Sequence, residues 1–182
     1  MALLIDTHLT FEDHVRMSQI EREYFQSDYY DSPELSWELF CKNSETFLCV
    51  RDTENGKIAA HLTLIPVTDE TFESILSGDM IDSTITADQI LKYDVPGEYK
   101  LHLLAVAIAM EYRNGLLFAI LYRAFKKKIM DLAKRGIVIT GISADCVCEE
   151  SEILCVKLLN MNFVKLSPRN SKIYWADSLV AK

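Results

Sequence analysis

Hydrophobic positions in the middle of the chain change their spacing near residue 110. Residues 101–109 are almost all apolar and contain one histidine, His102. A short run of this kind predicts a strand that is buried on both faces. After a polar segment at 111–115, a helical spacing predicts a long helix that ends at Gly136. The apolar stripe of this helix is Leu117, Leu121, Phe125, Ile129 and Leu132.

Two helices and a hairpin are predicted before this central strand. Thr10-Phe-Glu-Asp13 is typical of a capping box, and Ser32-Pro33-Glu34 is typical of a second helix start. Asn55-Gly56 favours a tight turn between two apolar runs, and Pro66 is expected to end the second run. The strands predicted in this part of the chain are residues 2–6, 47–51 and 58–65.

Residues 68–98 form a long acidic segment between the hairpin and the central strand. Residues 71–78 and 86–91 within it predict two short helices. Such excursions often carry function, and the alternative is a solvated flap without a ligand. The acidic residues of the segment include Asp69, Glu70, Glu73, Asp79, Asp82, Asp88, Asp94 and Glu98.

The chain closes with a second buried strand, a helix and two further strands. Residues 137–144 predict the buried strand, and a right-handed crossover through the long helix would make it parallel to residues 101–109. Residues 151–160 predict the helix. The closing strands are predicted at 163–166 and 172–176.

Composition excludes several kinds of partner. The net charge of −8 argues against nucleic-acid binding, which needs a basic surface. No apolar stretch reaches the roughly 18 residues of a membrane span, and the N-terminal segment lacks the cationic start of a signal peptide. Cys41, Cys49, Cys146, Cys148 and Cys155 include no Cys-x-x-Cys pair. We therefore expect reduced thiols in a cytoplasmic protein, without a metal site.

The order of these elements resembles the GNAT superfamily of acyl-CoA-dependent N-acyltransferases. Residues 13–25 resemble its first helix and 47–65 its hairpin. Residues 104–115 resemble the Ala-Val-x-Pro-x-x-Arg start of its cofactor loop, and 158–163 its Leu-Tyr-x-x-x-Gly-Phe segment. The resemblance implies an α/β fold: a mixed, mostly antiparallel sheet of about seven strands with one parallel pair and flanking helices. It also implies one domain over residues 1–182, with an insertion at about 68–98.

The same resemblance implies a site for acetyl-CoA or another acyl-CoA. N–H groups at a helix start favour an anion, although any strand-to-helix crossover contains such a turn. Gly115 is the only glycine of the loop, and Phe118 stands where the family has a small residue. By resemblance, the pantetheine arm would pair with Val106, Ala107 and Ile108. The pyrophosphate cradle would be Arg113, Asn114, Gly115, Leu116 and Leu117.

Catalytic candidates are fewer. His102 is the favoured base, acting through water, because imidazole changes its charge near neutral pH. The alternative is a core histidine that pairs with His61. The family's glutamate base would fall near Lys100 and is therefore missing. Glu98, at the entrance of the strand, is a second candidate, and the alternative is an ordinary exposed carboxylate. The family's tyrosine acid falls on Leu158 or Leu159. Three cysteines, Cys146, Cys148 and Cys155, are expected near the departing thiolate, and ordinary core packing is the alternative explanation for them.

The acceptor is predicted to be a primary amine of a small molecule or a protein. Tyr24, Tyr29 and Tyr30, with nearby acidic residues, suit a cationic amine, although an ordinary packed loop has the same composition. The resemblance implies an N-acetyltransferase. The alternative is a catalytically inactive protein of the same fold that binds a ligand or a partner protein. A homodimer through the closing strands is also left open.

Overall fold

The computed structural model describes residues 2–25, 32–113 and 115–177. A seven-stranded sheet with the order β1-β2-β3-β4-β5-β7-β6 forms its centre, and only β4 and β5 pair in parallel. This arrangement confirms the predicted fold class. The strands are β1 (Leu3–Asp6), β2 (Phe47–Asp52), β3 (Ile58–Val67), β4 (Gly97–Ile108), β5 (Ile137–Cys146), β6 (Asn162–Leu166) and β7 (Lys172–Ala176).

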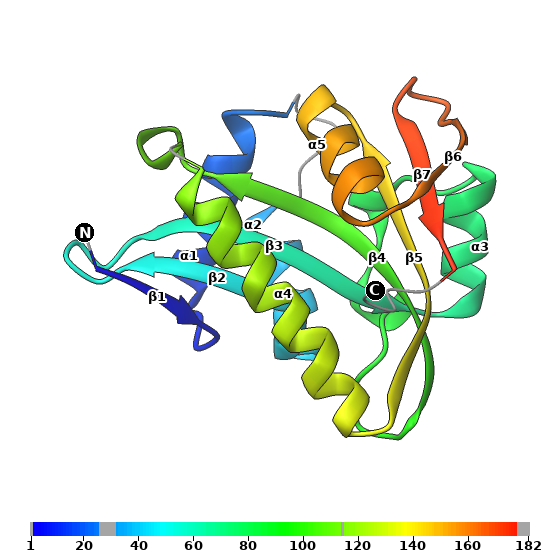
Figure 1. Cartoon of the computed structure of the whole chain (residues 1–182), viewed down its shortest axis with the longest axis horizontal. Coiled ribbons are helices and arrows are strands. Elements are labelled where there is room, and N and C mark those ends of the chain that lie inside the picture. Colours follow the sequence, from blue (N-terminus) through cyan, green and yellow to red (C-terminus); the bar gives the residue numbers. More distant parts are fainter. Residues whose placement is uncertain (1, 26–31, 114, 178–182) are drawn as a thin grey trace.

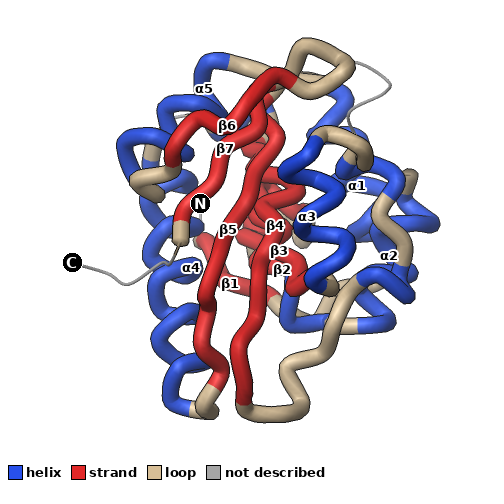
Figure 2. Tube along the Cα trace, turned by 90° about the vertical axis from the view of Figure 1, so that its right-hand side faces the viewer, coloured by secondary structure: helices blue, strands red, loops and turns tan. Residues whose placement is uncertain are grey.

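Helices cover both faces of the sheet. Figure 2 shows α4 on one face and α1, α2 and α3 on the other. Their bounds are α1 (Phe11–Arg22), α2 (Pro33–Lys42), α3 (Asp69–Ser77), α4 (Leu116–Lys134) and α5 (Glu149–Ile153). No helix in the described ranges has both the length and the apolar character needed to cross a membrane.

Each face of the sheet has its own hydrophobic core. The stripe of α4 that the sequence predicts is buried at Leu117, Leu121, Phe125 and Leu132. On the opposite face the buried side chains come from three helices: Met17, Ile20, Leu39, Phe72 and Ile75. Because both faces are covered, β3 is buried along its whole length, which explains its nearly continuous apolar sequence.

Local signals placed most helix ends correctly. The Thr10 side chain accepts a hydrogen bond from the Asp13 N–H, and the Asp13 carboxylate accepts one from the Thr10 N–H, as the capping box predicts. Ser32 caps α2 by accepting from the Leu35 N–H. Gly78 ends α3 with a left-handed φ of 79°.

Pro66 does not end its strand, contrary to expectation. The Pro66 carbonyl accepts a hydrogen bond from the Leu91 N–H at 2.8 Å. The nitrogen and carbonyl of one strand residue point to the same side, so the Pro66 nitrogen also faces away from β4. The missing N–H therefore removes no hydrogen bond of the β3–β4 ladder, and β3 continues to Val67.

Two predicted helices also differ. The 86–91 segment forms only a 3-10 turn, η3 (Ala87–Gln89), because Ile90 is drawn into a bridge with Val67. The 151–160 segment begins earlier as α5 and continues as a π-helix, η5 (Leu154–Leu158). Tertiary pairing overrides the helical spacing in the first case. In the second, the Leu159 N–H donates to the Leu154 carbonyl five residues earlier, which is the spacing of a π-turn.

Two histidines are enclosed on the α1 face of the sheet. His14 of α1 is fully buried, with its Nδ1 2.7 Å from the Ser36 hydroxyl and its ring among Trp37, Phe40 and Phe47. Burial lowers the pKa of His14 to about 4. Burial likewise lowers the pKa of His61 on β3 to about 3. Both imidazoles are therefore neutral at physiological pH.

Candidate functional site

β4 and β5 run side by side at their starts and then separate. Their pairing extends from Gly97↔Ile137 to Leu103↔Ala144. Beyond this point β5 pairs with β7, while β4 continues to Ile108 with β3 as its only partner in the described sheet. Figure 1 shows the two strands diverging, with α5 near the opening. We call this opening the fork and the Leu103↔Ala144 pair its apex.

A bulge in β4 helps to create the fork. Thr63 of β3 pairs with Ala105 and Leu64 pairs with Leu103, so Leu104 is an extra residue in β4. An extra residue bends a strand and reverses the alternation of its side chains. Accordingly, Leu101 and Leu103 pack on the α4 side, and so do Val106 and Ile108 beyond the bulge.

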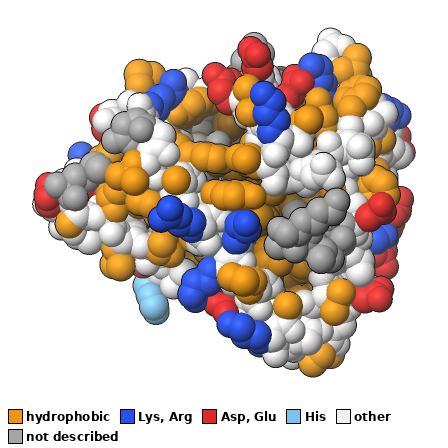
Figure 3. Space-filling model, in the orientation of Figure 1, with side chains coloured by type: hydrophobic (Ala, Val, Ile, Leu, Met, Phe, Trp, Pro, Cys, Tyr) orange, Lys and Arg blue, Asp and Glu red, His pale blue; other side chains and the backbone are white. Residues whose placement is uncertain are grey.

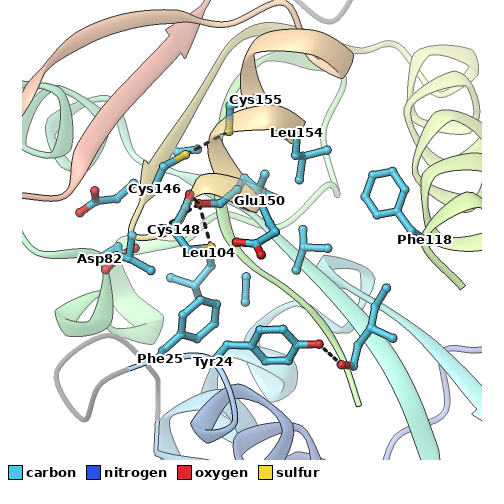
Figure 4. A pocket seen from close by; sticks show the side chains of 18 of the residues that line it. Tyr24, Phe25, Asp82, Leu104, Phe118, Cys146, Cys148, Glu150, Leu154 and Cys155 are labelled. Atoms are coloured by element: carbon cyan, nitrogen blue, oxygen red, sulfur yellow. Dashed lines mark hydrogen bonds between the residues drawn. The ribbon is translucent and has the colours of Figure 1, made fainter. Parts of the chain in front are cut away.

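The fork contains a cavity of about 360 Å³. Both strands, the end of α1, the start of α4 and α5 contribute to its walls. In the space-filling view, hydrophobic side chains surround a hollow on this face of the molecule (Figure 3). The close-up shows Cys146, Cys148 and Cys155 across the cavity from Tyr24 and Phe25, while Asp82 and Phe118 lie at its opposite ends (Figure 4).

The α4 end of the cavity has the features of an anion site. Gly115 caps α4 with a left-handed φ of 77°, and a Cβ added there would meet no atom within 4 Å. Among the described residues no side chain caps this helix start. Arg113 and Gly115 line the cavity. N–H groups of a first helical turn beside a guanidinium can hold a phosphate group.

Phe118 stands at the edge of this end and does not fill the fork. Its ring stacks on Tyr122, with 6.3 Å between centroids and 9° between planes. It packs against the core on the α4 side while forming part of the cavity wall. A phenylalanine at the small-residue position is therefore compatible with an open fork.

Tyr24 contacts the predicted cofactor residues. Its hydroxyl donates to the Ile108 carbonyl, and its ring lies 3.8 Å from the Arg113 guanidinium carbon. Burial raises the pKa of Tyr24, and Arg113 opposes that rise. The structure thus places Tyr24 beside the strand end and the loop. Tyr29, Tyr30 and Asn114 lie outside the described residues.

The loop before α4 is anchored on both sides. Glu23 of α1 accepts a hydrogen bond from the Met110 N–H at 3.0 Å. Arg16 of α1 forms a 2.7 Å ion pair with Glu111. On the other side, the Tyr112 hydroxyl donates to Asp52 at 2.8 Å. These contacts hold residues 110–112, which follow β4, in place.

His102 lies one position before the apex and has no exposed surface. Its Nδ1 is 2.9 Å from the Ser143 hydroxyl of β5, and its Nε2 is 3.6 Å from an Asp82 carboxylate oxygen. Asp82, in the turn η2 (Asp82–Thr84), lines the cavity. His102 therefore contacts a residue of the cavity wall, Asp82, but does not line the cavity itself. Its suggested partner His61 is four positions away in register, beside Ala107, and lies 3.4 Å from Glu21.

Asp145 is a second carboxylate at the apex. It directly follows Ala144 on β5 and lines the cavity. Burial raises the pKa of Asp145; Asp82 raises it further, whereas Ser171, His102 and Arg169 lower it. Its Oδ1 is buried and has no hydrogen-bond partner among the described residues. A buried carboxylate oxygen of this kind indicates a place for a cation or a donor.

The sequence analysis did not select Asp82 or Asp145. Asp82 was one acidic residue among many in the 68–98 segment, and no local pattern distinguishes it. Asp145 carries a weak signal, because Ser143 and Asp145 are two residues apart and share one face of β5. A polar pair on one face at the end of a buried strand could have drawn attention to it.

Three of the cysteines, Cys146, Cys148 and Cys155, line the cavity. Cys146 Sγ is 3.3 Å from Cys155 Sγ, and Cys148 is half-buried at the start of α5. The hydrogen bond with Cys155, together with burial, raises the pKa of Cys146. Cys146 is therefore a neutral thiol. All five cysteines of the chain are free.

Several other candidates lie away from the cavity wall. Glu98 is exposed near the start of β4, opposite Val138, roughly 20 Å along the strand from Leu104. Lys100 pairs with Asp69 and Glu73 at the surface. Three residues of the predicted cofactor set do not line the cavity: Ala107, Leu116 and Leu117. Each of them was predicted to contribute a backbone N–H.

No protein-family model matches the sequence, and no curated protein matches it either. Solved structures do match over nearly the whole chain. One is the loading GNATL domain of CurA from Lyngbya majuscula, with a TM-score of 0.66 and 14% identity, covering 97% of this chain and 98% of that one. The ribosomal-protein-S18-alanine N-acetyltransferase from Escherichia coli has a TM-score of 0.53 and 16% identity, with coverages of 100% and 97%.

A third similar structure was solved with a ligand. It is Naa50 from Arabidopsis thaliana in complex with the bisubstrate analogue CoA-Ac-MVNAL. Its TM-score is 0.57 and its identity is 10%, with coverages of 97% of this chain and 99% of that chain. At these identities the similarity shows the fold. The chain has the GNAT fold, as its sequence pattern predicts.

Proposed function

We propose that this protein is an N-acyltransferase that moves an acetyl group, or another acyl group, from the corresponding acyl-CoA to a primary amine. The acceptor amine would belong to a small molecule or a protein. The acyl-CoA supplies an activated thioester carbonyl. The structural neighbours named above support this proposal, because they include an N-acetyltransferase and a complex with a CoA-containing analogue.

The observation that carries the proposal is the open fork. Past Leu103, β4 presents a strand edge that β5 does not pair with, and the cavity runs along this edge towards Gly115. An extended amide-containing arm can pair with such an edge, as Val106 to Ile108 are predicted to do. The α4 start and Arg113 would hold the pyrophosphate at the far end.

The chemistry needs a neutral amine and a protonated leaving group. An amine loses a proton before it attacks, so a carboxylate at the apex serves that need better than fully buried His102 does directly. Cys146 lines the wall as a neutral thiol, so it adds no negative charge that would oppose a departing thiolate.

Acetyl-CoA is expected to stabilise the protein against heat. A ligand at 100 times its dissociation constant adds about 2.7 kcal/mol to the free energy of unfolding. For a chain of this size that corresponds to a rise in melting temperature of about 5–10 °C. Differential scanning fluorimetry with and without acetyl-CoA measures the shift, and free CoA and adenosine are compared at equal concentration.

The same titration separates the proposal from its alternative. An unchanged melting temperature at millimolar acetyl-CoA would exclude the transferase and favour an inactive protein of the same fold. A shift without thiol release from acetyl-CoA, across a panel of amines, would favour a ligand-binding protein. A shift together with amine-dependent thiol release supports the transferase.

A further inference from the structure

We propose that Asp82 and Asp145 together form the acceptor subsite, which binds an aliphatic primary amine as its ammonium ion. This inference rests on the proposed acyl transfer and names the acceptor chemistry within it. It also gives the 68–98 segment a function, because that segment supplies Asp82. His102 and Ser143 would act behind Asp82 as positioning residues.

The two carboxylates lie at the closed end of the fork, on one face of the sheet. His102 pairs in register with Ser143, one position before the apex, and Asp145 follows one position after it. Asp145 is on the same face of β5 as Ser143, since they are two residues apart. Asp82 reaches this face from the 68–98 segment and lies 3.6 Å from His102 Nε2.

Polar atoms at this end lack the partners that burial requires. The His102 side chain is 0% exposed, and within the described chain its Nε2, directed at Asp82, has no hydrogen-bond partner. The Oδ1 of Asp145 is also buried and has no hydrogen-bond partner among the described residues. Buried polar groups in native proteins are nearly always satisfied, so the unpartnered Asp145 Oδ1 on the cavity wall, together with the buried His102 nitrogen aimed at Asp82 on the same wall, indicates a missing ligand. A group that brings N–H donors and a positive charge satisfies the carboxylates.

The charge distribution distinguishes the two ends of the cavity. Arg113 and Gly115 line the α4 end, which suits an anion, whereas Asp82 and Asp145 line the apex. Figure 4 shows Asp82 at the far end from Phe118, which projects from α4. An acyl-CoA with its phosphates at α4 would therefore direct its thioester towards the carboxylates. An ammonium ion is the complementary charge there, since a carboxylate pair repels acidic acceptors.

The transfer step then balances as follows. The ammonium gives one proton to the Asp145 carboxylate, and the neutral amine nitrogen attacks the thioester carbonyl carbon. The carbon–nitrogen bond forms as the carbon–sulfur bond breaks, and the sulfur takes the second nitrogen proton. Asp145 later releases its proton to solvent. The products are an amide, a free thiol and one proton.

The test measures steady-state acetylation of amine probes by the wild-type protein and by single variants. The probes are putrescine, glucosamine and an alanyl peptide, and the best acceptor of the three is used throughout. Asp145→Asn and Asp82→Asn should each lower kcat/KM for this amine by about 10- to 100-fold, because each removes a charge-assisted contact. His102→Gln should raise the KM for the amine and leave the KM for acetyl-CoA unchanged.

Two control variants locate the effect. Asp79→Asn removes an exposed carboxylate of the same 68–98 segment and should leave kcat/KM unchanged within about two-fold, as is usual for surface sites. Glu150→Gln removes a carboxylate from another part of the cavity wall. If it lowers kcat/KM as much as Asp145→Asn does, the general charge of the cavity is responsible and the carboxylate-pair inference is overturned.

Measuring acetyl-CoA binding separately distinguishes a failure of the acceptor subsite from a failure of the proposed function. The inference is supported when both Asp→Asn variants retain the acetyl-CoA melting shift and lose amine turnover. It fails, with the transferase function intact, when both variants acetylate the amine as fast as the wild type. It also fails when acetyl-CoA binds but none of the three amines is acetylated. If acetyl-CoA does not bind the wild type, the proposed function itself fails.

Discussion

Replacing Val106 with tryptophan is expected to abolish acetyl-CoA binding. Val106 is half-buried, lines the cavity and follows the bulge at Leu104 on the unpaired edge of β4. A tryptophan ring would occupy the space between the strands, so the dissociation constant should rise by at least about 100-fold, which is about 2.7 kcal/mol. The acetyl-CoA melting shift should disappear, and isothermal titration calorimetry should detect no binding at micromolar protein.

A matched substitution controls for the effect of tryptophan on folding. Val138 is exposed near the start of β5, where β4 and β5 are still paired. Val138→Trp should therefore retain the full acetyl-CoA shift. If Val106→Trp keeps a folded melting transition and still binds acetyl-CoA as the wild type does, the cofactor does not lie in the fork.

Mild acid is expected to destabilise the protein strongly. In the unfolded chain His14 and His61 have the ordinary pKa of 6.5, whereas burial lowers the pKa of His14 to about 4 and of His61 to about 3. Between these values only the unfolded state takes up the protons, so stability falls as pH decreases. From pH 7.5 to pH 5 each histidine contributes a loss of about 2 kcal/mol, or about 4 kcal/mol together.

Urea denaturation at a series of pH values measures this loss. His14→Phe keeps an aromatic ring among Trp37, Phe40 and Phe47 and removes the titrating group. It should remove about half of the decline, whereas His8→Phe, at an exposed position, should leave the decline unchanged. Equal slopes for wild type and His14→Phe would show that His14 is not titrating as a buried neutral group.

The carboxylates of Asp6 and Asp13, on the same face of the sheet, take up protons at lower pH than the unfolded histidines do. Burial opposes ionisation of Asp6 and Asp13, but hydrogen bonds from Arg51 help to hold the pKa of each below its ordinary value of 3.8. Their contribution is therefore present above that pH and is lost below it. The window between pH 7.5 and pH 5 therefore separates His14 and His61 from these two carboxylates.

Sequence patterns predicted the parts of the site that depend on neighbouring residues. The apolar run at 101–109, the polar turn and the α4 stripe are local features, and each became the expected element. The same patterns could not predict the bulge at Leu104, because a bulge is a relation between β4 and β3. Pro66 was assigned incorrectly for a similar reason: its effect depends on which side its nitrogen faces.

For the candidate base His102, too, the sequence predicted some features and only the fold determined the others. His102 was selected because one imidazole interrupts an apolar strand, and the structure places it one position before the apex. Its lack of exposure and its contact with Asp82 depend on how the 68–98 segment folds back over the sheet. Glu98 was selected for its place in the chain, and strand geometry puts it at the other end of β4.

By itself, the sequence determined the strand-turn-helix at the centre and the order of elements, because hydrophobic period and capping residues act over a few positions. The class of fold followed from the resemblance of that order to a known superfamily. Only the tertiary structure decided that Asp82 and Asp145 line the same cavity and that Asp82 contacts His102. These three side chains come from segments up to 63 positions apart, which only the pairing of β4 with β5 and the placement of the acidic segment bring together.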